Sequence, residues 1–236
     1  MSWSFTLSHL PTPLAGSTLL TRFSFGVNGT TTYSTNGIHA TLNGGPSYTS
    51  GGLTFNGSRA VVAAGGAKQY LSLPSTAFGA FTSVSIEMWV TTAANNPSWA
   101  TLFGWCANVP GYGCTNALYV THDVESKDVI DLGYSPRSGI SQTSASLAAF
   151  DSQTNMHIVL TAAPGAPARL YKNGDLITTT PVAIPAFIPP EMFYVGNSPA
   201  TSTDTGFKGS IKEFRIWGGI LSPSDVSRHY YSQGSG

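Results

Sequence analysis

Short runs in which apolar and polar residues alternate recur along the whole chain. In the run 84–90, the first, third, fifth and seventh residues are apolar and share one face, while Glu87 and Trp89 lie on the other. A period of two is typical of a half-buried β-strand. Similar runs predict further strands at 19–25, 37–42, 53–55, 70–73, 100–105, 117–122, 129–134, 156–162, 168–172, 176–179, 193–196 and 210–217.

The residues between these runs are turn formers. Asn173-Gly174 is a strong signal for a two-residue hairpin turn. The Pro-rich stretch 178–190 is short and apolar, and we expect it to be a crossover loop between strands. The one helix signal is Ser222-Pro223-Ser224-Asp225, a variant of the capping box, and it predicts a helix from about Pro223 to Tyr231.

About a dozen short strands and a single short helix define the fold class. This pattern predicts an all-β protein, a sandwich or jelly roll, with one short C-terminal helix. The 236 residues contain no internal repeat and no break typical of a linker. We therefore expect one domain over 19–236, with 1–18 forming an N-terminal extension or a first strand.

The low charge of the chain argues against two classes of function. Charged residues make up 9% of the chain, and 11 basic residues balance 11 acidic ones, whereas a typical domain carries about 25% charged residues. A nucleic-acid-binding protein or a polybasic membrane-surface module would show a basic excess. A neutral surface rich in hydroxyl groups suits an extracellular or cell-surface location, although the N-terminal residues show no signal peptide.

Several stretches follow one another in the order seen in a known family. Val84–Val90 is similar to "f-T-i-E-x-W-v", Arg169–Gly174 to "l-Y-v-N-G", and Phe207–Trp217 to "f-x-G-x-I-d-E-v-R-i-y". With five further stretches, they resemble the concanavalin A-like lectin/glucanase superfamily, in its LamG-like jelly-roll branch. The resemblance implies a two-sheet antiparallel jelly-roll sandwich (concanavalin A-like), with one sheet concave and the other convex. It leaves function open, since the family includes lectins, adhesion domains, pentraxins, glycoside hydrolases and lyases.

An enzyme is not expected. Glucanases of this fold carry the run E-x-D-x-x-E, which places two carboxylates on one face of a strand. The chain has no such run, and Glu87 stands alone on its strand, where we interpret it as a structural hydrogen-bond acceptor. Asp123 and Glu125 are the nearest substitute. They fit a solvated hairpin, a metal site or, least well, a catalytic pair.

The resemblance also implies a possible calcium site, because members of this fold often bind Ca²⁺ through loops at the rim of the sandwich. Ca²⁺ takes six to eight oxygen ligands. The candidate ligands are Asp123, Glu125, Asp128 and Asp204.

The two cysteines, Cys106 and Cys114, bracket a turn-rich loop between two predicted strands. They are too few for a zinc site, and we expect them to close the loop as a disulfide, the alternative being two reduced and packed thiols.

Four aromatic residues flank this loop or the hairpin that follows. Exposed rings there could stack on the C–H face of a sugar; the alternative is that the rings fold back onto the sandwich. These candidates for carbohydrate binding are Trp99, Trp105, Tyr112 and Tyr134.

These features favour a non-catalytic recognition module that binds carbohydrate. Its partners would be glycans or glycoproteins, with self-association as a further possibility, and without nucleic-acid binding or membrane insertion. The alternative is a structural or assembly domain of a surface layer, filament or virion, because low net charge favours association. A polysaccharide hydrolase or lyase is the third candidate.

Overall fold

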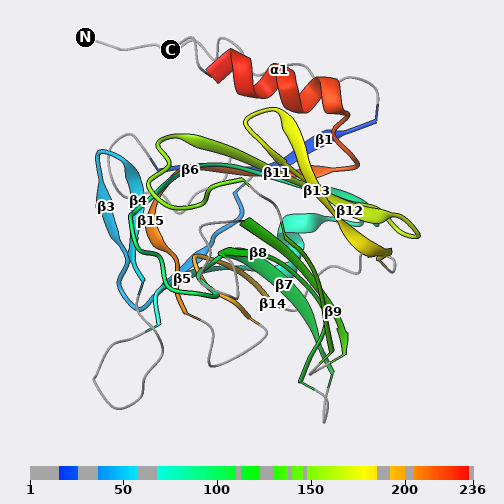
Figure 1. Cartoon of the computed structure of the whole chain (residues 1–236), viewed down its shortest axis with the longest axis horizontal. Helices are drawn as coiled ribbons and strands as arrows, with labels where there is room; N and C mark the ends of the chain where they lie inside the picture. The colour runs from blue at the N-terminus through cyan, green and yellow to red at the C-terminus, as the bar shows by residue number, and fades with distance from the viewer. Residues whose placement is uncertain are drawn as a thin grey trace.

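The computed structural model describes residues 16–25, 37–57, 68–109, 113–122, 130–137, 140–145, 148–184, 192–199 and 205–233. Two antiparallel sheets stack face to face, and one helix lies across the outer face of one of them (Figure 1). The fold class expected from the sequence is confirmed. The first described strand begins at Thr18, while the division at residues 18 and 19 stays a prediction.

The eight-stranded sheet is built around β6 (Val84–Thr92) and β15 (Lys208–Gly218), which pair along almost their whole length. Strand β1 (Thr18–Ser24) pairs with the second half of β15, whose first half pairs with β4. The other strands of the sheet are β3 (Ser47–Thr49), β4 (Gly52–Asn56), β11 (Met156–Ala162), β12 (Pro167–Lys172) and β13 (Asp175–Ala183).

The seven-stranded sheet runs in the order β10-β9-β8-β7-β14-β5-β2. In Figure 1 strands β7, β8 and β9 bend away from the other sheet, so the outer face of this sheet is concave. Its strands are β2 (Thr41–Asn43), β5 (Tyr70–Leu73), β7 (Thr101–Val109), β8 (Gly113–His122), β9 (Ile130–Arg137), β10 (Ile140–Ala145) and β14 (Met192–Val195).

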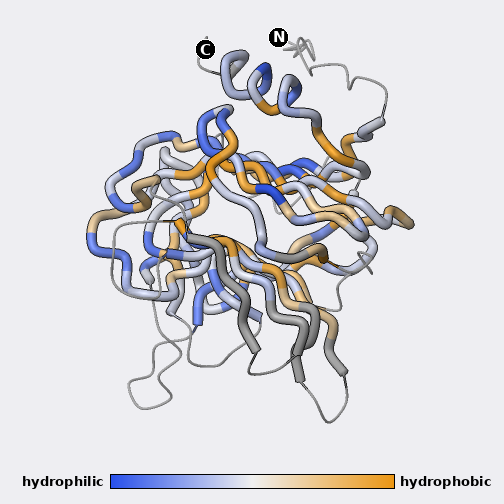
Figure 2. The backbone as a smooth tube through the Cα atoms, turned by 45° about the vertical axis from the view of Figure 1, so that its right-hand side comes forward, coloured by the Kyte–Doolittle hydropathy of each residue, from blue (hydrophilic) through white to orange (hydrophobic). Residues whose placement is uncertain are grey.

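A single large apolar core fills the space between the sheets. Alternate residues of the strands point into it, as the period-two pattern requires, and the hydrophobic segments of both sheets face each other in Figure 2. Phe193 lies near its centre, with ring centroids 5.0 Å from Phe78 and 5.8 Å from both Trp105 and Phe214. Interlocked aromatic rings of this kind hold the two sheets at a fixed spacing.

Helix α1 (Pro223–Gln233) begins at a reciprocal cap. The Ser222 hydroxyl accepts a hydrogen bond from the backbone N–H of Asp225 at 3.1 Å, and the Asp225 carboxylate accepts the backbone N–H of Ser222 at 3.2 Å. The carboxylate also lies at the positive end of the helix dipole. The capping box predicted from the sequence is confirmed.

Replacing Ser222 by alanine should lower the free energy of unfolding by about 1 kcal/mol, because one backbone N–H of the helix start loses its acceptor. Urea unfolding measures the change. Ser224→Ala is the matched control, since this serine is exposed and its hydroxyl bonds to the Ser222 hydroxyl, and it should stay within about 0.5 kcal/mol of the wild type. Equal losses in both variants would contradict the capping role.

The structure differs from the sequence-based expectation in three unpredicted elements and in one loop. Strands β3 and β10 and the 3₁₀ helix η1 (Ser75–Phe78) were not predicted. The crossover loop expected over 178–190 is wrong in its first part, because β13 continues to Ala183. Pro181 does not stop the strand, since β13 is at the edge of its sheet, where a missing N–H costs no ladder hydrogen bond. In the part of the chain that the structure describes, no helix has the length and apolar character to cross a bilayer.

Candidate functional site

On the concave face of the seven-stranded sheet, the side chains of the neighbouring strands β2, β5 and β14 lie in rows across the sheet. Thr41 pairs with Ser72, and Ser72 pairs with Tyr194, so these three residues form one row across the sheet. Their neighbours Leu71 and Phe193 point into the core. Alternation therefore sends the Thr41, Ser72 and Tyr194 side chains to the concave face.

Three further residues, each two positions away from a member of the first row, complete a pocket, and two of them lie just beyond the ends of β2 and β5. These residues are His39, Pro74 and Met192. Together with the first row, and with the backbone of Leu73 and Phe193 beneath, they line a cavity of about 330 Å³. This volume is at the small end of the roughly 300–1,000 Å³ typical of small-molecule sites.

Polar groups and apolar surface both line the pocket. Hydroxyl groups come from Thr41, Ser72 and Tyr194, an imidazole from His39, and apolar surface from Met192. The Ser72 hydroxyl donates to the Thr41 carbonyl at 3.4 Å and accepts from the Asn43 amide at 3.2 Å. The pocket therefore combines fixed hydrogen-bonding groups with an apolar wall.

Tyr194, which lines the pocket, packs against Tyr70. The ring centroids of Tyr70 and Tyr194 are 4.3 Å apart, and the planes meet at 32°. Burial, together with the neighbouring Tyr70 hydroxyl, raises the pKa of Tyr194 above its ordinary value of 10.0. The Tyr194 hydroxyl is therefore a neutral hydrogen-bond donor at physiological pH, and it lies 3.9 Å from Sδ of Met192.

The aromatic surface continues from the pocket along the same row of the sheet. Tyr194 pairs with Gly104, Gly104 with Tyr119, and Tyr119 with Gly133. A Cβ atom at Gly133 would lie 2.0 Å from Cε2 of Tyr119, so the glycine allows the tyrosine ring to lie flat across the sheet. Small and aromatic residues thus alternate across the strands and leave a low, apolar floor.

Met192 joins the pocket to a small apolar cluster on this floor. The cluster consists of Cys106, Ala117 and Tyr119, with Trp99 and Met192 packed against it. Trp99, a predicted sugar-stacking residue, is half-buried and so keeps part of its ring accessible. The structure therefore places Trp99 and the pocket on one continuous apolar strip.

The other predicted aromatic residues have different positions. Trp105 and Tyr134 belong to the core, where they are 5% and 6% exposed, and the Trp105 ring stacks on Phe193. Their assignment to sugar stacking is corrected, because each sits on the core-facing side of its strand. Tyr112 lies outside the described residues.

The predicted calcium ligands cannot be placed in the same way. Asp123, Glu125, Asp128 and Asp204 all lie outside the described residues. Within the described ranges, no three His, Cys, Asp or Glu side chains gather in a way that would hold a metal ion. Calcium binding through these four acids stays a prediction.

The predicted disulfide also stays a prediction. Cys106 is buried on β7, and Cys114 lies on the neighbouring strand β8, where it pairs with Asn108; the Cys114 side chain is outside the described residues. Thiol titration of the denatured, unreduced protein should find no free thiol, and two after reduction. Two thiols before reduction would contradict the disulfide.

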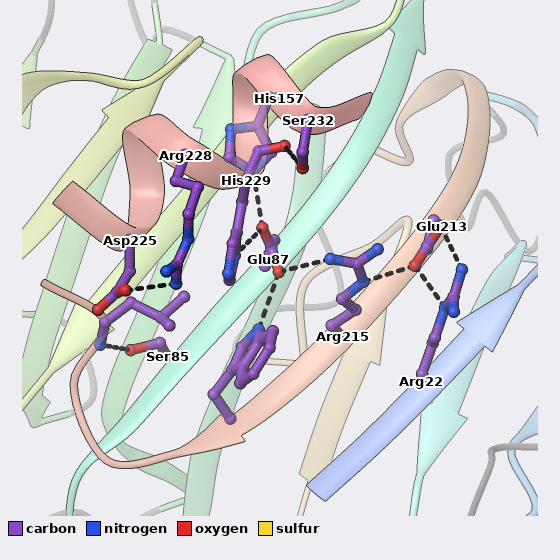
Figure 3. Close-up of polar contacts among 12 residues, drawn as sticks. Arg22, Ser85, Glu87, His157, Glu213, Arg215, Asp225, Arg228, His229 and Ser232 are labelled. Atoms are coloured by element: carbon purple, nitrogen blue, oxygen red, sulfur yellow. Dashed lines mark hydrogen bonds and ion pairs between the residues drawn. The ribbon is translucent and has the colours of Figure 1, made fainter. Parts of the chain in front are cut away.

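A second polar cluster lies on the opposite, outer face of the eight-stranded sheet, beneath α1 (Figure 3). Glu87 is fully buried there and accepts four donors. Its Oε1 accepts His157 Nε2 and His229 Nδ1, each at 2.9 Å. Its Oε2 accepts Trp217 Nε1 at 2.8 Å and a guanidinium nitrogen of Arg215 at 3.3 Å. The interpretation of Glu87 as a structural acceptor is confirmed.

The electrostatics of Glu87 follow from these partners. Burial alone would raise the pKa of this carboxyl, but the hydrogen bonds from His157 and His229 and the charge of Arg215 outweigh burial. The pKa of Glu87 is therefore held well below its ordinary value of 4.5. Arg215 also binds Glu213, which in turn pairs with Arg22 on β1 at 2.6 Å. Through these ion pairs and hydrogen bonds the cluster ties β1, β6, β15 and α1 together.

A depressed pKa makes stability depend on pH. Above about pH 4.5 Glu87 is ionised in both the folded and the unfolded chain, so its stabilisation is complete. Below that pH, Glu87 becomes protonated in the unfolded chain but stays ionised in the folded chain. We expect stability to fall as the pH drops from 4.5 towards 2.5, by up to about 1.4 kcal/mol per pH unit from this group. Urea unfolding at pH 7, 4.5, 3.5 and 2.5 tests this; constant stability below pH 4.5 would contradict it.

The pocket residues were not identified from the sequence. The alternation in Tyr70-Leu71-Ser72-Leu73 and in Met192-Phe193-Tyr194-Val195 marks the polar members of both strands as facing away from the core. The sequence does not show the strand order and register that bring these two strands beside β2.

Comparisons with known proteins agree on the fold. A family model described as the concanavalin A-like lectin/glucanases superfamily matches residues 65–227. No curated protein gives a significant match. Among solved structures, domain 4 of the extracellular arabinanase AbnA from Geobacillus stearothermophilus, in complex with arabinotriose, is similar with 19% identity and a TM-score of 0.63. That match covers 90% of this chain and 98% of that domain.

Two other similar structures belong to longer chains. Trypanosoma rangeli sialidase, solved with 2,3-difluorosialic acid, has 18% identity and a TM-score of 0.69 over 94% of this chain, which spans 33% of the sialidase. The binding domain of botulinum neurotoxin serotype G has 16% identity and a TM-score of 0.60 over 92% of this chain and 52% of that one. At these identities the likeness concerns the fold alone. The family match extends over more than half of the sequence, and so the chain belongs to the concanavalin A-like lectin/glucanases superfamily.

Proposed function

We propose that this protein is a non-catalytic carbohydrate-binding module of a secreted or cell-surface protein. The observation that carries the proposal is the pocket on the concave sheet, where hydroxyl groups and an imidazole surround the Tyr194 ring. A sugar presents an apolar C–H face and a rim of hydroxyls. The pocket offers the complement of both, with an aromatic wall and groups that donate and accept hydrogen bonds.

The rigidity of the pocket supports binding. Six of its eight lining residues lie on the paired strands β2, β5 and β14, and the row Thr41–Ser72–Tyr194 is fixed by strand register. A site held in one geometry loses little conformational entropy when a ligand binds. The Asn43–Ser72 hydrogen bond further orients one of the hydroxyls.

The buried acids support a non-catalytic role. A retaining glycosidase needs two carboxyl groups about 5–5.5 Å apart, one of them with a raised pKa so that it can donate a proton. Glu87 has the opposite property, since the pKa of this buried carboxyl is lowered, and α1 covers it. Within the described residues that line the pocket, none is an acid.

Binding is tested by screening the purified protein on a glycan array and then titrating the best ligands by calorimetry. We expect saturable binding that is lost in Tyr194→Ala. A parallel titration in EDTA examines the proposed calcium dependence. An array without a single bound glycan, in the presence of Ca²⁺, would count against the proposal.

Light scattering after size exclusion addresses the alternative, an assembly domain. A carbohydrate module that acts alone should elute as a monomer with a mass near 24.7 kDa. Large homopolymers that form without any glycan would favour the assembly role.

A further inference from the structure

We infer that the pocket selects an uncharged saccharide and rejects acidic ones such as sialic acid or a uronate. The inference rests on the proposed carbohydrate-binding function and specifies its ligand class. It starts from an asymmetry between the two sheets. Of all residues in the strands of the seven-stranded sheet, only Asp131 and Arg137 carry a formal charge.

The eight-stranded sheet has a different composition. Five of its strands, β1, β6, β12, β13 and β15, contain charged residues, and together these include both acidic and basic side chains. These residues are Arg22, Glu87, Arg169, Lys172, Asp175, Lys208, Lys212, Glu213 and Arg215. Charge is thus concentrated on one sheet, and the sheet that holds the pocket is nearly free of it.

The two charges of the seven-stranded sheet are far from the pocket. Both belong to β9, which is separated from β14 by β8 and β7. Three strand spacings correspond to about 14 Å. This exceeds the Debye length of about 8 Å at physiological ionic strength, so the charge of Asp131 acts only weakly on a ligand at Tyr194.

Lys68, which precedes β5, is the other cation to consider. It is four residues from Ser72, or about 13 Å along an extended chain. Its Nζ donates to the carbonyl of Ser198 at 2.8 Å, which directs the ammonium group toward the loop after β14. The eight residues that line the pocket include no Lys, Arg, Asp or Glu.

Desolvation then determines the specificity. A carboxylate that enters the pocket gives up strong hydration, and recovering that free energy requires a guanidinium, an ammonium or several backbone N–H groups. The pocket supplies hydroxyls, an imidazole and a thioether instead. A sugar hydroxyl exchanges water for these groups at little cost, so uncharged sugars are favoured.

The test compares ligands that differ by one charge. The best array ligand is resynthesised with the C6 hydroxymethyl group of its terminal residue oxidised to a carboxylate. Both forms are titrated at pH 8, where a histidine side chain is ordinarily neutral. We expect the uronate form to bind about tenfold more weakly or worse, and binding of the uncharged form to change less than twofold between 50 and 500 mM NaCl. Similar affinities, or tighter uronate binding, would overturn the inference.

A variant provides the converse test. Thr41 is exposed on the edge strand β2, where lysine is tolerated. Thr41→Lys should bind the uronate form several-fold more tightly than the wild type does, in a salt-dependent manner, while Thr41→Gln should not. Absence of any gain in a folded Thr41→Lys protein would contradict the inference. If that variant does not fold, the wild-type titrations decide.

The array separates the inference from the proposed function. Hits confined to sialylated or uronate-containing glycans would overturn the inference and leave carbohydrate binding intact. An array without hits would overturn both. The solved sialidase complex with sialic acid makes acidic glycans the natural competitor to include.

Discussion

Replacing Glu87 by glutamine should lower the free energy of unfolding by about 3–5 kcal/mol. Four donors converge on the Glu87 carboxylate, and a carboxamide offers one acceptor oxygen in place of two. The new NH₂ group would face donors, and the buried charge of Arg215 would lose one of its two carboxylate partners. Urea unfolding would show a lower midpoint with an unchanged slope.

The control is Asp175→Asn, a matched acid-to-amide change at an exposed position at the start of β13. It should stay within about 0.5 kcal/mol of the wild type. A loss below about 1 kcal/mol in Glu87→Gln would mean that the cluster under α1 contributes little to the stability of the fold.

Replacing Tyr194 by alanine should weaken glycan binding at least about tenfold, because an aromatic anchor at the centre of a pocket carries much of the binding free energy. The substitution removes the ring that stacks against Tyr70 and one of the pocket's hydroxyl groups. Tyr194→Phe keeps the ring and should lose less. Calorimetric titration with the best array ligand measures both.

Tyr231→Ala is the matched control for this change. Tyr231 is 69% exposed on α1, on the opposite side of the sandwich from the pocket. The variant should bind as the wild type does. If the wild type and a folded Tyr194→Ala protein bound the glycan with equal affinity, the pocket would not be the binding site. The candidate site would then be the part of the apolar strip around Trp99.

Much of the fold could be predicted because its signals are local. The alternation over 84–90 lies within a single strand, although both faces of that strand are buried, and the Ser222–Asp225 cap involves residues three apart. Asn173 and Gly174 both adopt positive φ, at 52° and 93°, as the predicted hairpin turn requires. Each of these features is decided by neighbouring residues, so the sequence contains the information directly.

The site was harder to predict because it is assembled across strands. The pocket joins segments near residues 40, 73 and 193, and only the order β14-β5-β2 brings them together. The same limit explains the error at Trp105 and Tyr134. Position near a loop suggested exposure, whereas strand register places both rings in the core.

The most direct test of the account is an NMR titration of the ¹⁵N-labelled protein with its best glycan ligand. We predict that the largest amide shifts fall in β2, β5 and β14, around Thr41, Ser72 and Tyr194, with the amides of α1 unchanged. Shifts confined to the segment 106–114 or to the loop that contains Asp204, with the three strands unaffected, would contradict it.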